Sequence, residues 1–233
     1  MIRTFGMLSG IFLGLAPVLA HAADRPVVVE LFTSQGCSSC PPANAFLNEM
    51  TKDRADVLPL GFHVTYWDRL GWKDPFSFEF ATKRQAVYGH RFGDGSYTPE
   101  IVVDGRAGFV GSDRDQVNAA IDQARRDQAT AADLSAIRSG DIVTVKIGSG
   151  SGIGKLLLVG FDREHTTSIH RGENGGRSFY ETNVVRSARP IGDWSGDAKT
   201  LHEKAPQGQE AAVIVEAPDG RIIGAARVSS GST

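Results

Sequence analysis

Cysteine is scarce in this chain, and its scarcity excludes one class of protein. Only two of the 233 residues are cysteines, far too few for a small scaffold held together by several disulfides. The formal net charge is −2 at pH 7, and so near-neutral a balance argues against a dedicated nucleic-acid-binding protein, which carries a basic stripe. The two cysteines therefore form either one structural bridge or a working redox pair.

The chain also lacks an apolar run of the roughly 20 residues that a bilayer-spanning helix needs. An uncharged apolar stretch covers residues 5–19, follows Arg3 and precedes Ala20-His21-Ala22. A basic start, an apolar stretch and a small-x-small tripeptide are typical of a cleaved export signal. We expect residues 1–22 to be this signal, with an uncleaved anchor as the alternative. The protein is then periplasmic or secreted, with no stable membrane span after cleavage.

After this segment, strand-like and helix-like patterns alternate up to about residue 130. Apolar residues recur at helical spacing in three segments, and Asp104-Gly105 separates two short apolar runs as a hairpin turn does. The predicted strands are 27–32, 57–64, 101–103 and 107–110, and the predicted helices are 43–50, 75–91 and a last one from 112 onwards.

From about residue 130 the helical pattern stops and short strand-like runs with Gly-rich turns follow. The runs lie at 142–147, 155–161, 184–188, 211–215 and 221–228. We therefore expect an α/β domain over 24–129 and a smaller antiparallel β domain over 130–233, the latter without catalytic residues of its own. The Gly-rich turn between Arg171 and Arg177 is expected to be a solvated hairpin tip, with a weak anion or partner site as the alternative.

Cys37-Ser38-Ser39-Cys40 lies between the first predicted strand and the first predicted helix. The positive end of a helix favours a thiolate, and cysteines in such motifs have pKa values lowered from ~8.5 to roughly 3.5–7.5. Cys37 is expected to be the attacking thiol and Cys40 the resolving thiol. The alternative is a plain structural disulfide, which would close a very short loop and stabilise the chain little.

The order of these elements carries a resemblance to a known superfamily. Cys37-Ser38-Ser39-Cys40-Pro41, followed later by the run 97–105 with Thr98-Pro99, resembles the thioredoxin-like superfamily over about residues 25–128. The resemblance implies a thioredoxin-like fold for the first domain. It also implies a cis Thr98–Pro99 bond beside the cysteines, where Thr98 pairs with an extended substrate. The alternative is an ordinary trans proline that begins an edge strand.

A closer resemblance covers nearly the whole chain after the signal. The runs 29–42, 63–76, 171–177 and 183–186 are similar to an exported bacterial family catalogued as domain of unknown function number 1223. This family has no assigned activity, so the resemblance implies a fold and a compartment but no substrate.

One acidic residue lies within the first apolar strand. Glu30 shares a strand face with Val28 and Phe32, and a buried carboxyl group there would have a raised pKa. It could move a proton to or from Cys40. The alternative is a structural acid that is hydrogen-bonded to a tyrosine or to the backbone.

The loop after the second strand places aromatic residues where an α/β sheet carries its functional loops. Tyr66, Trp67 and Trp72 are expected to border the cysteines and bind substrate, or alternatively to pack the loop on the core. His63 could instead join Cys37 and Cys40 in a copper or zinc site.

The function expected from these residues is thiol–disulfide exchange by an exported oxidoreductase, with no cofactor beyond the Cys37–Cys40 disulfide. Its partner would be a protein or a small molecule that carries a thiol or disulfide. A metal-binding or metal-delivery module, and a non-catalytic binding protein with a structural disulfide, are the alternatives. The direction of the redox chemistry and the oligomeric state stay open.

Overall fold

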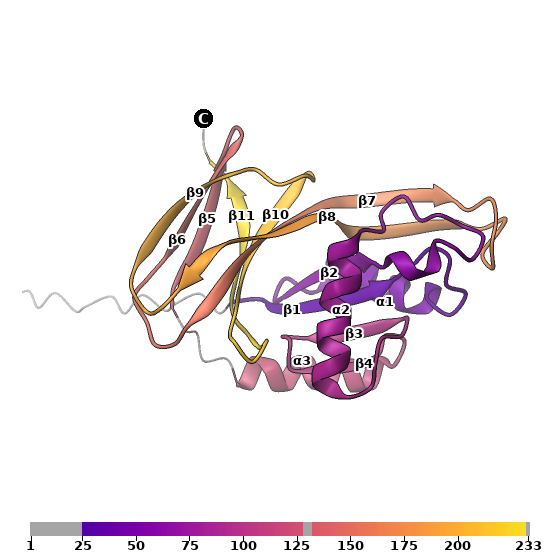
Figure 1. The fold of residues 1–233 in the computed structure, drawn as a ribbon, viewed down its shortest axis with the longest axis horizontal. Helices are drawn as coiled ribbons and strands as arrows, with labels where there is room; N and C mark the ends of the chain where they lie inside the picture. Colours follow the sequence, from indigo (N-terminus) through magenta and orange to yellow (C-terminus); the bar gives the residue numbers. More distant parts are fainter. Residues whose placement is uncertain (1–24, 128–131, 232–233) are drawn as a thin grey trace, which may run out of the picture.

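The computed structural model of the protein describes residues 25–127 and 132–231 (Figure 1). The expected export signal and the expected boundary near residue 130 lie outside the described residues. The elements in chain order are β1 (Val27–Thr33), α1 (Pro41–Asp53), β2 (Val57–His63), the 3-10 turn η1 (Thr65–Trp67), α2 (Glu79–Phe92), β3 (Glu100–Val103), β4 (Ala107–Val110), α3 (Arg114–Arg126), β5 (Leu134–Ser139), β6 (Ile142–Ile147), β7 (Gly154–Ser168), β8 (Ser178–Trp194), β9 (Lys199–Lys204), β10 (Glu210–Glu216) and β11 (Ile222–Ser230).

Strand β1 lies inside the sheet and is buried along its whole length. It pairs in parallel with β2 and antiparallel with β3, which in turn pairs with β4. Helices α1 and α3 pack on the face that carries Val29 and Leu31, whereas α2 packs Tyr88 on the face that carries Val28 and Phe32. Burial on both faces explains why the sequence of β1 is almost continuously apolar.

The expected fold class, a thioredoxin-like α/β domain followed by a smaller antiparallel β domain, is wrong. The protein is mostly β, and its strands form one mixed sheet in the order β4-β3-β1-β2-β8-β7-β10-β11-β5-β6-β9. The two halves of the chain join where β8 pairs in parallel with β2, at Gly61 and Val184. Besides β1–β2 and β2–β8, strands β11 and β5 also pair in parallel.

The junction between β2 and β8 has a local cause. Asn183 adopts a positive φ of 48° and its amide donates to the carbonyl of Pro59 at 2.8 Å. Gly61 has no side chain, and a Cβ atom there would lie 3.7 Å from the carbonyl oxygen of Asn183. A glycine on β2 and an asparagine that tolerates the left-handed region therefore allow the two backbones to approach.

One hydrophobic core spans both halves of the chain. Leu60 and Phe62 of β2 belong to the same buried cluster as Leu157 and Phe161 of β7 and Ile214 of β10. Strands β7 and β8 form a long hairpin that starts in the C-terminal half and reaches over the N-terminal helices (Figure 1). A second cluster fills the other end, between β5, β6, β7, β10 and β11. The two halves of the chain therefore share one of their buried clusters.

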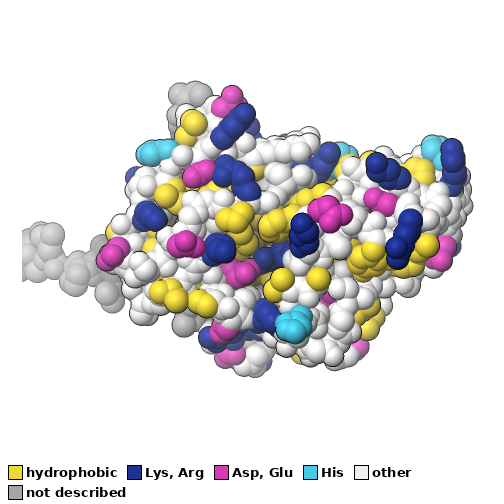
Figure 2. All heavy atoms as spheres, viewed as in Figure 1, with side chains coloured by type: hydrophobic (Ala, Val, Ile, Leu, Met, Phe, Trp, Pro, Cys, Tyr) yellow, Lys and Arg dark blue, Asp and Glu magenta, His cyan; other side chains and the backbone are white. Residues whose placement is uncertain are grey.

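The surface matches the near-neutral charge of the sequence. On the face shown in Figure 2, basic and acidic side chains are interspersed rather than gathered into a stripe of one sign. Within residues 25–127 and 132–231, no helix is long and apolar enough to cross a membrane.

Candidate functional site

The two cysteines are joined in a disulfide at the start of α1. Cys40 immediately precedes the helix, and its carbonyl accepts hydrogen bonds from the N–H groups of Ala43 and Asn44 at 3.0 and 3.1 Å. Pro41 occupies the first helical position, where its missing N–H costs nothing. The disulfide therefore lies at the positive end of the helix dipole, where a thiolate is stabilised.

Both cysteines are fully buried. Cys37 and Cys40 have relative exposures of 0%, whereas Ser38 and Ser39 between them are exposed. Burial of the expected nucleophile is a feature that the sequence pattern did not indicate, and it means that exchange requires some covering segment to move.

The cis geometry expected for the Thr98–Pro99 bond is confirmed. The hydroxyl of Ser39 donates to the carbonyl of Thr98 at 3.4 Å and also lies 3.4 Å from the Sγ atom of Cys37. The loop that precedes β3 therefore lies beside the cysteine motif, as expected.

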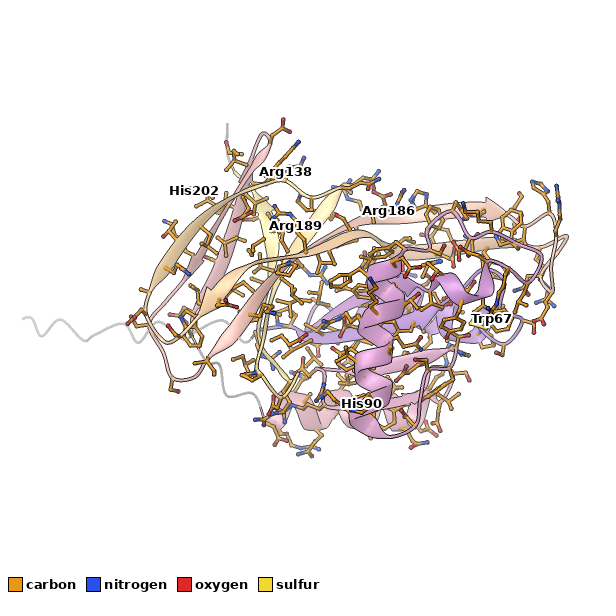
Figure 3. The ribbon with its side chains drawn as sticks, in the orientation of Figure 1. Trp67, His90, Arg138, Arg186, Arg189 and His202 are labelled. Atoms are coloured by element: carbon orange, nitrogen blue, oxygen red, sulfur yellow. A yellow bond between two sulfur atoms is a disulfide. The ribbon has the colours of Figure 1, made fainter. Side chains whose placement is uncertain are left out.

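Two of the three expected aromatic residues are brought to this loop. The indole N–H of Trp67 donates to the hydroxyl of Thr98 at 2.8 Å, and a Cβ atom on Gly36 would lie 3.6 Å from the Cβ atom of Trp67. Tyr66 donates to Gln85 of α2 at 3.1 Å. Trp67 is labelled in Figure 3 at the end of the molecule that carries this loop. Both aromatic side chains are half-buried, so each packs on the core while retaining an exposed part.

Trp72 lies on another side of the motif. Its indole N–H donates to the side-chain carbonyl of Gln35 at 3.1 Å, and its ring meets that of His170 at a centroid distance of 6.0 Å. His170 belongs to the turn that connects β7 to β8, which we call the hairpin tip (residues 169–177). Trp72 thus connects the segment before Cys37 to the C-terminal half of the chain.

The hairpin tip contributes directly to the cysteine motif, which sequence reasoning missed. The amide of Asn174 donates to the carbonyls of Gln35 and Cys37 at 3.0 and 2.9 Å. Glu173 accepts a hydrogen bond from the N–H of Ser38 at 3.2 Å. The expected solvated tip is correct for its exposed residues but wrong for Asn174, which has an exposure of 0%.

A buried polar network lies behind the motif. His63 Nδ1 lies 2.7 Å from a carboxylate oxygen of Asp74, which also accepts from the N–H of Gln35 at 2.8 Å. Glu181 of β8 lies on the other side of the imidazole, 3.8 Å from Nε2, and accepts from the side-chain amides of Gln35 and Asn44 at 2.7 and 3.1 Å. The network ties β2, α1 and β8 to the segment that leads into Cys37.

The charges in this network perturb one another. Burial works against a charged imidazole, but the charges of Asp74 and Glu181 outweigh it and raise the pKa of His63 to about 9. Burial raises the pKa of Glu181, and the charge of His63 opposes that effect in part. Burial also opposes ionisation of Asp74, yet His63 and backbone N–H groups hold its pKa below the usual value. We therefore describe His63 and Asp74 as an ion pair at neutral pH.

His63 therefore lies between two carboxylates, those of Asp74 and Glu181, rather than beside the cysteines. Within residues 25–127 and 132–231, no group of three or more His, Cys, Asp or Glu residues is arranged to hold a metal ion. The arrangement gives the alternative metal site of Cys37, Cys40 and His63 no support.

Glu30 lies on the opposite face of the sheet from α1, together with Val28 and Phe32, as expected. Its carboxylate accepts two hydrogen bonds from Arg84, at 2.6 and 3.2 Å, and one from the hydroxyl of Tyr88 at 2.6 Å. These partners correspond to the structural alternative, in which a tyrosine binds the acid. The expected role of Glu30 in proton transfer to Cys40 finds no support in these contacts.

Glu100 is another buried acid that the sequence analysis did not single out. It follows Pro99 directly, and one of its oxygens accepts from Gln85 at 2.8 Å, while the other has no hydrogen-bond partner among the described residues. Burial raises its pKa to about 7. Its position in the otherwise apolar run Pro99-Glu100-Ile101-Val102-Val103 could have indicated a buried acid.

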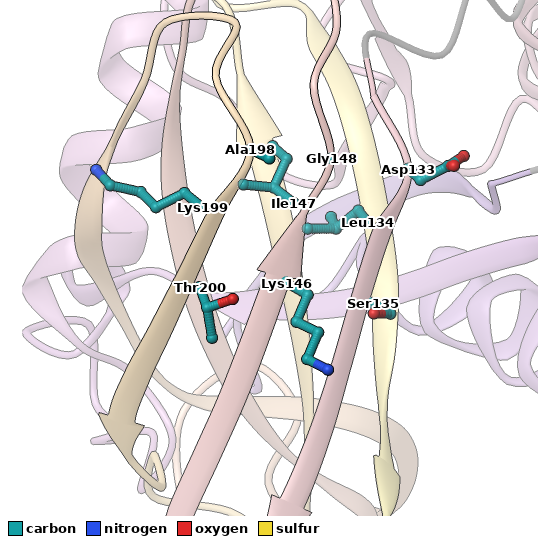
Figure 4. Close-up of a pocket in the computed structure, with 9 residues that line it drawn as sticks. All are labelled: Asp133, Leu134, Ser135, Lys146, Ile147, Gly148, Ala198, Lys199 and Thr200. Carbon is teal, nitrogen blue, oxygen red and sulfur yellow. The ribbon is translucent and has the colours of Figure 1, made fainter.

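Two hollows on the surface of the protein can be compared as places for a substrate. One, of about 470 Å³, lies between α1 and the start of β8 and includes Pro41, Asn44 and Arg177 in its lining, so it borders the cysteine motif. The other, of about 430 Å³, lies among β5, β6 and β9 with Lys146 and Lys199 in its lining (Figure 4). Neither cysteine lines the first hollow, although Pro41 directly follows Cys40, and the second hollow is built from the strands at one end of the sheet order.

Comparisons with known proteins find one matching family model and similar solved structures. A family model described as protein of unknown function (DUF1223) matches residues 28–216. A crystal structure of a protein from Agrobacterium tumefaciens is 32% identical with a TM-score of 0.77, covering 89% of this chain and 95% of that chain. HBP35 of Porphyromonas gingivalis is 13% identical with a TM-score of 0.61, covering 90% of this chain and 78% of that chain, and it shows a likeness of fold alone. No curated protein matches the chain.

Proposed function

The chain belongs to the DUF1223 family of proteins of unknown function, so we propose its function from the geometry of the site. We propose that the protein carries out thiol–disulfide exchange at Cys37 and Cys40, outside the cytoplasm. The observation that carries the proposal is the placement of the disulfide at the start of α1, beside the Thr98 carbonyl. A helix N-terminus stabilises the thiolate that leaves when a disulfide is attacked. The same local arrangement underlies the resemblance of this segment to thioredoxin-like proteins.

The proposed exchange balances without a further cofactor. A thiolate of a substrate dithiol attacks the Sγ atom of Cys37, the bond to Cys40 breaks, and Cys40 leaves as a thiolate that takes up a proton. The second thiolate of the substrate then attacks the substrate sulfur of the mixed disulfide, which forms the substrate disulfide and releases Cys37 as a thiolate. Two electrons pass from the substrate dithiol to the protein disulfide. Run in reverse, the same steps reduce a substrate disulfide, and the reduction potential decides the direction.

In this proposal, a substrate approaches Cys37 past Thr98, Trp67 and Tyr66. The backbone of Thr98 precedes β3, and an extended peptide could pair with it as a strand does. The half-buried aromatic rings of Trp67 and Tyr66 would contact apolar side chains of such a peptide. A protein or peptide with a thiol or disulfide therefore suits the site, and a small thiol compound is the simpler alternative.

A second candidate, a binding protein with a purely structural disulfide, is favoured by one observation. Both cysteines are fully buried, and catalytic cysteines are commonly partly exposed. The two candidates differ in whether a thiol can reach Cys37 while the protein is folded.

The test is to trap the mixed disulfide. In a Cys40→Ala variant, Cys37 should attack a peptide that contains a disulfide and stay joined to it as a mixed disulfide, because no resolving thiol is left to release the peptide. The matched Cys37→Ala variant, in which only the resolving thiol remains, should form much less adduct. Equal and slow adduct formation in both folded variants, at the rate of a buried inert thiol, would favour the structural disulfide.

A further inference from the structure

The hairpin tip covers the cysteine motif from the C-terminal half of the chain. Asn174 is buried completely, and its amide group bridges the carbonyls of Gln35 and Cys37. The side chain of Arg177 donates to the amide oxygen of Asn174 at 3.2 Å. This third bond fixes the amide so that both N–H groups point at the cysteine segment, which is a built contact rather than a chance approach.

Glu173 makes a second contact of a different kind. Its carboxylate accepts from the N–H of Ser38 at 3.2 Å, and this N–H belongs to the backbone immediately after Cys37. A thiolate at Cys37 would draw on the backbone N–H groups of the same turn for stabilisation. The negative charge of Glu173 occupies one such donor and repels a thiolate at the same time, so Glu173 disfavours the reduced, ionised form of Cys37.

The tip is held at its base and packed closely at its end. Asn48 of α1 donates to the carbonyl of Tyr180 at 2.8 Å and accepts from the N–H of Thr182 at 3.0 Å, which fixes the start of β8. A Cβ atom on Gly71 would lie 3.2 Å from the Cα atom of Gly172, so the loop after η1 touches the tip. Gly172 and Gly176 have φ angles of 75° and 85°, which allow the tight turn of the tip.

We propose that the hairpin tip is a cover of the redox site, in which Asn174 and Glu173 act as positioning residues that stabilise the disulfide form and limit access to Cys37. The proposal rests on the proposed thiol–disulfide exchange and adds a determinant from the C-terminal half of the chain. Asn174 holds the backbone of the cysteine turn in the conformation that the disulfide requires. A substrate thiol reaches Cys37 when these contacts open.

The test compares Asn174→Ala and Glu173→Gln with the wild type and with Asn48→Ala as the matched control. Asn48→Ala also removes hydrogen bonds between α1 and the β7–β8 hairpin, but it leaves the contacts to the cysteine turn intact. Glu173 is exposed, so Glu173→Gln keeps the fold even if Asn174→Ala does not. Each protein is equilibrated with dithiothreitol buffers of graded ratio, and the rate of its reduction and the pH dependence of Cys37 alkylation are measured.

We expect Asn174→Ala to raise the equilibrium constant for reduction about tenfold, which is about 30 mV for a two-electron couple, and to speed reduction by dithiothreitol. Glu173→Gln should move the alkylation profile of Cys37 to lower pH. Asn48→Ala should match the wild type in both. A purely structural role of the tip would lower stability without moving the potential or the pH profile.

The outcomes separate this inference from the proposed function. If the wild type exchanges and both tip variants behave like Asn48→Ala, the inference is overturned and the function stands. If the wild type resists every dithiol and Asn174→Ala exchanges readily, the cover is supported and the function is overturned. If neither protein exchanges while folded, both are overturned.

Discussion

Replacing Glu30 by alanine separates a structural role for this acid from a catalytic one. The carboxylate is fully buried and accepts from Arg84 and from Tyr88. Removal of one partner from a buried ion pair costs about 3–5 kcal/mol, because the other charge is left unpaired in the interior. Arg84 keeps a second carboxylate, Glu216, at 2.7 Å, so we expect the lower end, about 3 kcal/mol.

A loss of this size lowers the melting temperature by roughly 6–12 °C in a chain of this length. The free energy of unfolding is measured by chemical denaturation. Glu49→Ala is the control, because Glu49 pairs with Arg114 in a similar way but its side chain is 52% exposed, and an exposed pair contributes about 0–1 kcal/mol. We expect the pH dependence of Cys40 alkylation to be the same in Glu30→Ala and the wild type. A small loss of stability with a shifted alkylation profile would show that Glu30 exchanges protons with Cys40.

Three further predictions follow from the described contacts. The pKa of His63 is raised from 6.5 to about 9 when folded, so its contribution, on the order of 3 kcal/mol, is complete below pH 6.5 and is lost as the pH rises through 9. Denaturation curves at several pH values should show this alkaline loss, and His63→Gln should flatten it, whereas an unchanged slope would contradict the ion pair. The fragment 24–129 lacks about half of the buried cluster that both halves of the chain share, so we expect its circular dichroism to show no cooperative melting; a folded, active fragment would refute this. In the reduced protein, iodoacetamide should modify Cys37 faster than Cys40 and with a lowered pKa, as judged by mass spectrometry, and equal rates with ordinary pH dependence would argue against the thiolate.

The sequence predicted the elements around the cysteines well, because their signals are local. Strand β1 is almost continuously apolar because both of its faces are buried. Helix α1 has apolar residues at helical spacing because only one of its faces is buried. The second helix begins at Glu79 rather than at Pro75. The reason is that Asp74 is engaged with His63 and with the N–H of Phe76, which holds the residues before α2 in a loop.

The prediction of the second half failed where pairing is long-range. Strands β5 and β9 mix polar and apolar residues and were not predicted. Strands β7 and β8 continue well beyond their apolar parts, because Asp162–Ser168 pairs with Ser178–Val184 in a largely polar ladder. The parallel pairing of Gly61 with Val184 joins residues far apart in the chain, and no local pattern encodes it.

The sequence predicted which residues lie beside the disulfide in part, but it missed the residues of the hairpin tip that contact the cysteine motif. Cys37, Cys40, Thr98 and Trp67 come together as expected, because a motif and its neighbouring loop follow from the order of strands. Asn174 lies in a Gly-rich run typical of an exposed turn, so only the three-dimensional arrangement reveals that it binds the carbonyl of Cys37.

The measurement that tests the central claim most directly is the reduction potential of the Cys37–Cys40 pair in the folded, full-length protein. It is obtained by equilibrating the protein with dithiothreitol or glutathione buffers and counting the free thiols by alkylation. Structural disulfides of exported proteins have potentials below about −300 mV, whereas catalytic ones lie higher. Thiol–disulfide exchange as the function predicts a potential above about −300 mV, with reduction that is reversible without unfolding. A lower potential, or a disulfide that is reduced only when the protein unfolds, would contradict it.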